Sequence, residues 1–125
     1  MAAPNIVNVA LSNANSNNMT LSTTSEIGLL SNPASSGKVY KVNTIMVANR
    51  ETNANAVTVT VNVYTGAALT GSGFPIAQAI SVPGNASLIV IDKSTSFYLE
   101  ENESIGIKSG TSSGLAVMTS WEEIS

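Results

Sequence analysis

Residues 57–64 carry the feature that most constrains the fold, a strict alternation of valine with polar or amphipathic residues. Val57, Val59, Val61 and Val63 occupy every second position. Because successive side chains of a β-strand point to opposite faces, this spacing predicts a strand with its valines on a core and the intervening residues toward water or a partner. Branching at Cβ also suits a pleated sheet better than a helix. We expect this strand near the centre of a half-buried sheet.

The rest of the chain shows short apolar segments separated by turn residues roughly every 8–12 positions, and no amphipathic helix of useful length. This spacing predicts an all-β protein, a single antiparallel β-sandwich of about eight strands over residues 1–125, with either a jelly-roll or an immunoglobulin-like topology. Residues 1–20 are a candidate extended N-terminal arm. Within them, Asn5–Leu11 form either a first strand or part of that arm, and the Asn- and Ser-rich stretch Ser12–Asn18 is predicted to be a loop.

Three local features refine the prediction. In the segment Lys38–Ala48 the apolar residues change parity midway, so we expect a β-bulge near Asn43 and Thr44, where one extra residue reverses the facing of all that follow. A turn at 49–55 is expected to join this strand to the valine strand as an antiparallel hairpin. Pro75 lacks a backbone donor and predicts a strand end or an edge strand.

Composition narrows the possible functions. Charged residues make up only 10% of the chain, the net charge is −3, and the five basic residues are scattered. Binding to a phosphate backbone needs clustered basic residues, so a nucleic-acid partner is not expected. Neither a leader sequence nor an apolar run long enough for a membrane span is present, which predicts assembly in the cytoplasm without a membrane partner. The surface should be neutral and polar, as suits a protein packed into a dense assembly.

No motif commits the chain to catalysis. The sequence has no histidine and no cysteine, so the G-x-S-x-G match at 110–114 lacks the base that a hydrolase elbow needs, and a loop is the better interpretation. The acidic corner Glu100–Glu103 could bind Ca²⁺, but its spacing is not that of a calcium loop, and solvated turn charges are favoured. We therefore expect a non-enzymatic protein without catalytic residues, cofactor or metal.

The chain resembles a family of small virion proteins of tailed bacteriophages, including phages of cyanobacteria. The segments that carry the resemblance are Tyr40–Ile45, Ala48–Asn49, Val57–Tyr64, Ser81–Lys93, Tyr98–Ile105 and Ser120–Ser125. They cover about two thirds of the chain, in the order of the family pattern. At the position of Trp121 the family pattern more often has tyrosine. The resemblance therefore implies that this position requires an aromatic side chain rather than tryptophan specifically. From the residues alone, Trp121 is either part of the core, which we favour, or a plug for a neighbouring subunit.

The resemblance implies a small β-sandwich in the virion, most readily a capsid decoration or cement protein on the particle exterior, bound to the major capsid protein or other virion proteins. Shell symmetry suggests a homotrimer on a local threefold axis. A tail, neck or fibre-anchoring component and a carbohydrate-binding module for the host surface are the alternatives. The expected partner contacts are apolar residues of the arm and of the loop before Pro75, namely Ile6, Val7, Val9, Leu69 and Phe74.

Overall fold

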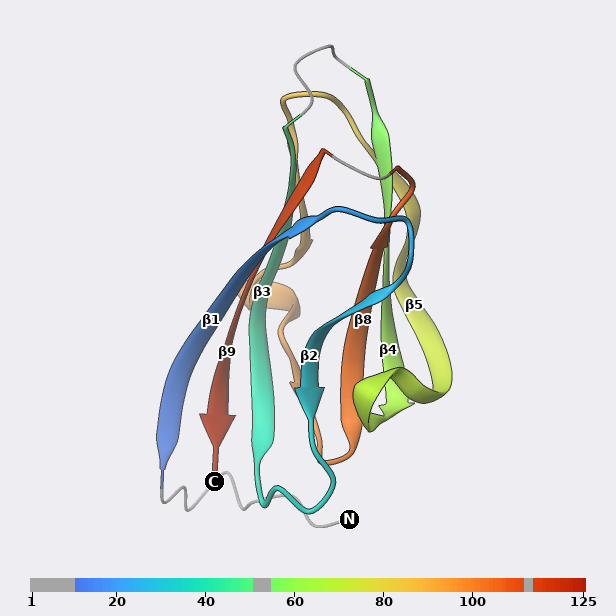
Figure 1. Cartoon of the computed structure of the whole chain (residues 1–125). Helices are drawn as coiled ribbons and strands as arrows, with labels where there is room; N and C mark the ends of the chain where they lie inside the picture. The colour runs from blue at the N-terminus through green and yellow to red at the C-terminus, as the bar shows by residue number, and fades with distance from the viewer. Residues whose placement is uncertain (1–10, 51–54, 112–113) are drawn as a thin grey trace.

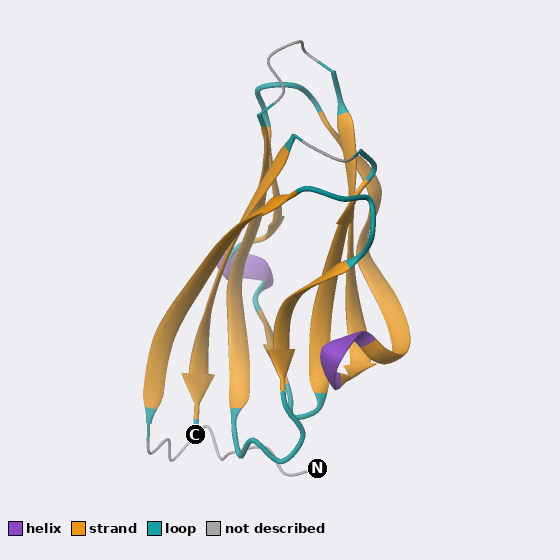
Figure 2. Cartoon of the chain, in the orientation of Figure 1, coloured by secondary structure: helices purple, strands orange, loops and turns teal. Residues whose placement is uncertain are grey.

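The protein is a β-sandwich of two antiparallel sheets. A computed structural model describes residues 11–50, 55–111 and 114–125. Figures 1 and 2 show the two layers side by side, built almost entirely of strands. Sheet A contains, in spatial order, β1 (Ser12–Leu21), β9 (Leu115–Ile124), β3 (Val39–Asn49) and β6 (Ser87–Ile91), and β7 (Phe97–Leu99) also pairs with β3. Sheet B contains β2 (Ile27–Asn32), β8 (Glu103–Ser109), β4 (Val57–Gly66) and β5 (Thr70–Val82). The 3₁₀ helices are η1 (Ala67–Leu69) and η2 (Lys93–Thr95). The all-β sandwich expected from the sequence is confirmed, with nine strands in the described residues.

The strand order decides between the two topologies that the sequence left open. Strands β1 to β4 enter sheets A and B alternately, and neither β1 and β2 nor β3 and β4 are neighbours. An immunoglobulin sandwich pairs its first two strands within one sheet, whereas a jelly roll distributes consecutive strands over both sheets. The order β1-β9-β3-β6 against β2-β8-β4-β5 is therefore that of a jelly roll.

The valine strand β4 lies in the middle of sheet B, between β8 and β5. Val57, Val59 and Val61 are at most 2% exposed, and Val63 is partly buried against the same core. The intervening Thr58 is exposed. Opposite them, sheet A contributes fully buried side chains on the facing strands, including Val42, Ile45, Val47, Leu99 and Leu115. The core is thus a layer of aliphatic side chains between the sheets, as in other aligned sandwiches.

Two buried asparagines connect the sheets. Asn32 ends β2 of sheet B, and its Nδ2 donates to the carbonyl oxygen of Leu99 in β7 of sheet A (3.1 Å) and to that of Lys38 (3.0 Å). Asn49 ends β3 of sheet A, and its Nδ2 donates to the carbonyl oxygen of Val82 in β5 of sheet B (2.8 Å). Both residues are at most 3% exposed. Each amide thus donates to a backbone carbonyl of the opposite sheet in a buried hydrogen bond, Asn32 to Leu99 and Asn49 to Val82.

Several local predictions are confirmed. The pairing of β3 with β9 shifts register between Val42 and Thr44, which places the expected bulge at Asn43. Because of it, Val42 and Ile45 both face the core. Pro75 lies on the edge strand β5, as expected.

Two predictions are wrong. Ser12–Asn18 are not a loop but the larger part of β1, because ten consecutive residues of this strand pair with β9 and the ladder outweighs the local turn preference of Asn and Ser. The strands on either side of residues 49–55 do not form a hairpin, since β3 belongs to sheet A and β4 to sheet B.

Some expectations fall on residues that the structure does not describe. These are residues 1–10 of the expected arm and first strand, most of the 49–55 turn, and the centre of the G-x-S-x-G loop. Residues 12–20, the other part of the expected arm, belong to β1 of sheet A. In the described part of the chain, no helix has the length and apolarity required to cross a membrane.

Candidate interaction surfaces

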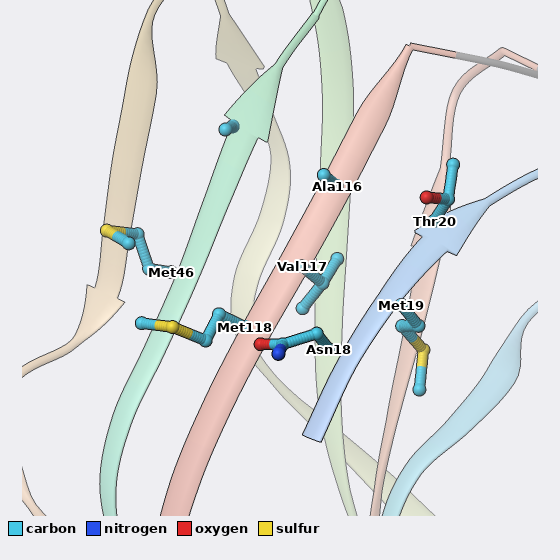
Figure 3. Close-up of a pocket in the computed structure, with 8 residues that line it drawn as sticks. Asn18, Met19, Thr20, Met46, Ala116, Val117 and Met118 are labelled. Atoms are coloured by element: carbon cyan, nitrogen blue, oxygen red, sulfur yellow. The ribbon is translucent and has the colours of Figure 1, made fainter. Parts of the chain in front are cut away.

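The outer face of sheet A carries a row of side chains that crosses its four main strands and is apolar on three of them, β9, β3 and β6. Register places Asn18 of β1 opposite Met118 of β9, Met118 opposite Met46 of β3, and Met46 opposite Ile89 of β6. We call these four residues the methionine row. Ile89 is 58% exposed and Met118 37%. Figure 3 shows the Met118 side chain extending from β9 over β3, and the Met46 side chain extending from β3 toward β6. Because methionine is flexible and polarizable, such a row can adapt to an irregular partner.

The surroundings of the methionine row are small or polar and nearly uncharged. On one side lie Thr20, Ala116 and Ala48, and together with the methionines they border a hollow of about 360 Å³. On the other side, the next outward-facing pairs of β3 and β9 are Thr44 with Ser120 and then Lys41 with Glu122. The second of these pairs combines opposite charges. Without a net charge of its own, this part of the sheet neither attracts nor repels a partner at long range, so contact there depends on shape and apolar burial.

A second apolar group lies along the edge strand β5, where Phe74 is 59% exposed and Ile76 and Ile80 are each 41% exposed. The strand is irregular, because its pairing with β4 shifts register three times. Ala79, between the two isoleucines, has a left-handed φ of 49°. Such bulges hinder the addition of another strand at this edge while leaving the side chains available for packing.

The outer face of sheet B is organised around the carboxylate of Glu26, which precedes β2. Tyr64 donates its hydroxyl to Glu26 Oε1 in a short hydrogen bond, and Asn62 Nδ2 donates to Glu26 Oε2 at 2.8 Å. The carboxylate lies over Gly106 of β8, where an added Cβ would come within 2.7 Å of it. The hydrogen bond to Glu26 raises the pKa of Tyr64 above its ordinary 10.0, because it favours the protonated hydroxyl. This cluster joins the β1–β2 loop to sheet B.

Replacing Tyr64 with phenylalanine is expected to lower the free energy of unfolding by about 1 kcal/mol at pH 8, the usual contribution of such a hydrogen bond. Because the folded-state pKa of Tyr64 is raised, its contribution is present below about pH 10 and disappears as the pH rises through the folded-state value. Urea denaturation of both proteins at pH 8 and above pH 10 measures this, and the difference between them should shrink at the higher pH. A difference that stays constant would contradict the assigned hydrogen bond.

A polar hollow of about 460 Å³ lies beside the bulges of β5 on the same face of sheet B. The residues that line it are Thr58, Thr60, Asn62, Pro75, Gln78, Ala79, Lys108, Ser109 and Gly110. Of these, Lys108 alone is ionisable. General acid–base chemistry needs a donor and an acceptor of protons within reach of one substrate. The side chains of this hollow do not supply such a pair.

The carboxylates of the acidic corner, Glu100–Glu103, do not converge on one point. Glu100 is exposed whereas Glu101 is 5% exposed, and Glu103 Oε1 accepts a hydrogen bond from the backbone N–H of Glu100 at 2.7 Å. Across the described residues, no three acidic side chains come together as a metal site would require. The corner is a tight turn, with Asn102 at a left-handed φ of 61°.

The partner contacts expected from the sequence are dispersed or not described. Ile6, Val7 and Val9 lie outside the described residues. Phe74 is exposed on β5, while Leu69 is half-buried in η1.

Trp121 packs against the core rather than projecting from it. The side chain is partly buried, its ring centroid lies 6.3 Å from that of the buried Tyr40, and its Nε1 donates to Glu123 Oε2 at 3.4 Å. This agrees with the core position favoured from the sequence.

Sequence reasoning missed the methionine row. The sequence did contain a sign of Met46's position, namely the change at Asn43 in which alternate residues are apolar. A bulge at Asn43 turns Ile45 and Val47 inward, so Met46 between them must face outward. The alignment with Met118 and Ile89 depends on pairing between distant strands and is not visible in the sequence.

Comparison with known proteins supports the fold. No protein-family model matches the chain, and no curated protein matches its sequence. A solved structure of Bacillus endospore appendages, described as a novel family of disulfide-linked pili, matches 91% of this chain and 85% of that chain with a TM-score of 0.51 at 16% identity. The acidic stable capsid structure of Helicobacter pylori bacteriophage KHP30 matches 94% and 90%, with a TM-score of 0.49 at 8% identity. The first likeness concerns the sandwich alone, and the second is too distant to add to it. This chain has no cysteine, so it cannot form the disulfide links for which the pili are described.

Proposed function

We propose that the protein is a non-enzymatic structural component of a bacteriophage virion, and specifically a decoration protein that binds the exterior of the capsid shell after synthesis in the host cytoplasm. The observation that carries the proposal is the outer face of sheet A, where the methionine row is apolar on three strands and its surroundings are nearly uncharged. The resemblance of the segments from Tyr40 to Ser125 to small virion proteins supports it independently. Jelly rolls also serve as viral capsid domains, although a fold by itself does not define a function.

The direct test is to locate the chain in purified particles by electron cryo-microscopy and to count its copies by quantitative mass spectrometry. A decoration protein is expected in hundreds of copies on the outer shell. A few tens of copies or fewer, placed at the neck, tail or fibre base, would instead establish the alternative virion role.

The carbohydrate-binding alternative has one supporting observation, the exposed aromatic residues Phe74 and Tyr98, which are 59% and 46% exposed. They belong to strands of different sheets, β5 and β7, whereas a sugar ring is usually held by a side chain placed among converging polar groups. Specific binding of the purified protein on a glycan array would favour this function over the structural one.

If the methionine row contacts the shell, replacing Ile89 with lysine is expected to weaken binding to undecorated capsids by about tenfold or more, because the charge must be desolvated in an apolar contact. Ser81→Lys, on the exposed outer face of β5 in the other sheet, is the matched control and should bind normally. Co-sedimentation with capsids measures the affinity, and both variants should keep the unfolding free energy within about 0.5 kcal/mol, as surface changes usually do. If the two variants bind capsids equally well, the methionine row is not the surface that contacts the shell.

A further inference from the structure

Strand β1 has an edge that differs from the other edges of the sandwich. It pairs with β9 over ten consecutive residues without a register shift. Among the described residues no strand pairs with its other edge. Natural edge strands are usually protected by charges, proline, bulges or shortness, because an open edge recruits further strands. No residue of β1 is charged, and none is proline.

The remaining edges carry such protection. Strand β5 contains Pro75 and three register shifts, β2 has a shift after Gly28, and β7 has three residues. Strand β6 has five residues and a register shift in its pairing with β3. In the part of the chain that is described, β1 is thus the long and regular edge.

The hydrogen bonds of β1 show which backbone groups face outward. Leu11 and Ser125 exchange both backbone hydrogen bonds, at 3.0 and 2.9 Å, and therefore form a hydrogen-bonded pair of the β1–β9 ladder. Such pairs alternate along an antiparallel ladder, and this ladder has no shift. The odd-numbered residues of β1 therefore bond to β9. The even-numbered residues direct their N–H and C=O groups to the open edge; they are Ser12, Ala14, Ser16, Asn18 and Thr20.

We infer that β1 pairs antiparallel with β1 of a second copy of this chain, about a two-fold axis beside Ser16. With the axis there, Ser16 faces its own equivalent, Ala14 faces Asn18, and Ser12 faces Thr20. All five outward-facing residues then form hydrogen-bonded pairs, with about ten hydrogen bonds in total, whereas any shifted register leaves some of them unpaired.

The side chains are compatible with this contact. Those of the even-numbered residues are exposed, small or polar, and uncharged. Each cross-strand pair therefore combines neutral side chains, and no like charges meet across the axis. The antiparallel contact of a strand with itself is self-complementary, as a two-fold interface must be. It differs from the threefold arrangement expected from shell symmetry, which would need two different surfaces.

The pairing would join two A sheets into one and place two methionine rows on one continuous face. This does not depend on the proposed virion role, but it would let a dimer contact a repetitive partner at two points. Two linked contacts bind far more tightly than either alone when the geometry allows both.

The test uses single cysteines, which are unambiguous because the chain has none of its own. Residues in a hydrogen-bonded antiparallel pair have Cα atoms about 5.5 Å apart, a distance that a disulfide can span. Under mild oxidation Ser16→Cys is expected to give several-fold more covalent dimer than Ser12→Cys or Thr20→Cys gives alone. Ser12→Cys and Thr20→Cys, equally exposed on the same strand, should not cross-link to themselves, but a mixture of the two should give the mixed dimer. Self-cross-linking of all three to a similar extent would contradict the register.

Association without cysteines completes the test. Analytical ultracentrifugation of the unmodified protein should show a dimer, and Ser16→Pro should shift it to a monomer. Because the Ser16 N–H points away from β9, proline there removes no bond of the β1–β9 ladder, and an unchanged circular dichroism spectrum verifies the fold. A trimer, or a monomer at all concentrations, would overturn the proposed pairing.

Discussion

Replacing Val59 with aspartate is expected to prevent folding, whereas the same substitution at the adjacent Thr58 should leave the sandwich intact. Val59 is fully buried in the middle of sheet B, and Thr58 is exposed on the opposite face of the same strand. An unpaired carboxylate in an aliphatic core costs several kcal/mol even if it becomes protonated. That is a large fraction of the 5–15 kcal/mol that typically stabilises a domain.

The measurement is urea denaturation of both variants followed by tryptophan fluorescence, which reports on the partly buried Trp121, together with proton–nitrogen NMR spectra. We expect a dispersed spectrum and near-normal stability for Thr58→Asp, and a collapsed or unfolded spectrum for Val59→Asp. Because the two positions are adjacent on one strand, strand propensity cannot explain the difference. Similar behaviour of the two variants would mean that the valines do not form the inner face of β4.

The second large effect is expected at the asparagines that connect the sheets. Replacing Asn32 with alanine removes the donor that serves the carbonyl oxygens of Lys38 and Leu99. Replacing Asn49 removes the donor to Val82. Each change deprives a buried carbonyl of its amide donor, which should lower the unfolding free energy by about 1–3 kcal/mol.

Asn13→Ala is the matched control, because Asn13 is exposed on β1 and should change stability by less than about 0.5 kcal/mol. Urea titration of the three variants gives the comparison. If Asn32→Ala were as stable as the control, water would have to reach the carbonyl of Leu99. Combining Asn32→Ala with Asn49→Ala should give nearly additive losses, because the two amides share no partner.

The sequence predicted the fold where the information is local. The alternation at 57–63 identified the inner face of β4, Pro75 indicated the edge strand β5, and the parity change at Asn43 located the bulge. These signals depend on steric preferences and on the period of two, which a single strand expresses by itself.

The predictions failed where distant segments decide the outcome. Ser12–Asn18 have a composition typical of loops, yet they form a strand because β9 offers them a regular ladder. The hairpin expected between β3 and β4 was inferred from adjacency in the chain, but Asn49 ends β3 with a side chain that reaches across to the other sheet. The methionine row requires the registers of four strands, which no local pattern contains.

The position of β9 also bears on how the protein is made. This strand, at residues 115–124, lies between β1 and β3, so both of its neighbours are synthesised long before it. On a translating ribosome that adds about 5–20 residues per second, β1 and β3 must therefore wait several seconds for the strand that joins them. Sheets closed by such long-range pairing fold slowly, and their unpaired edges are open to wrong partners in the meantime. Until residues 115–124 have left the exit tunnel, the edges of β1 and β3 that pair with β9 therefore lack the partner that they have in the folded protein.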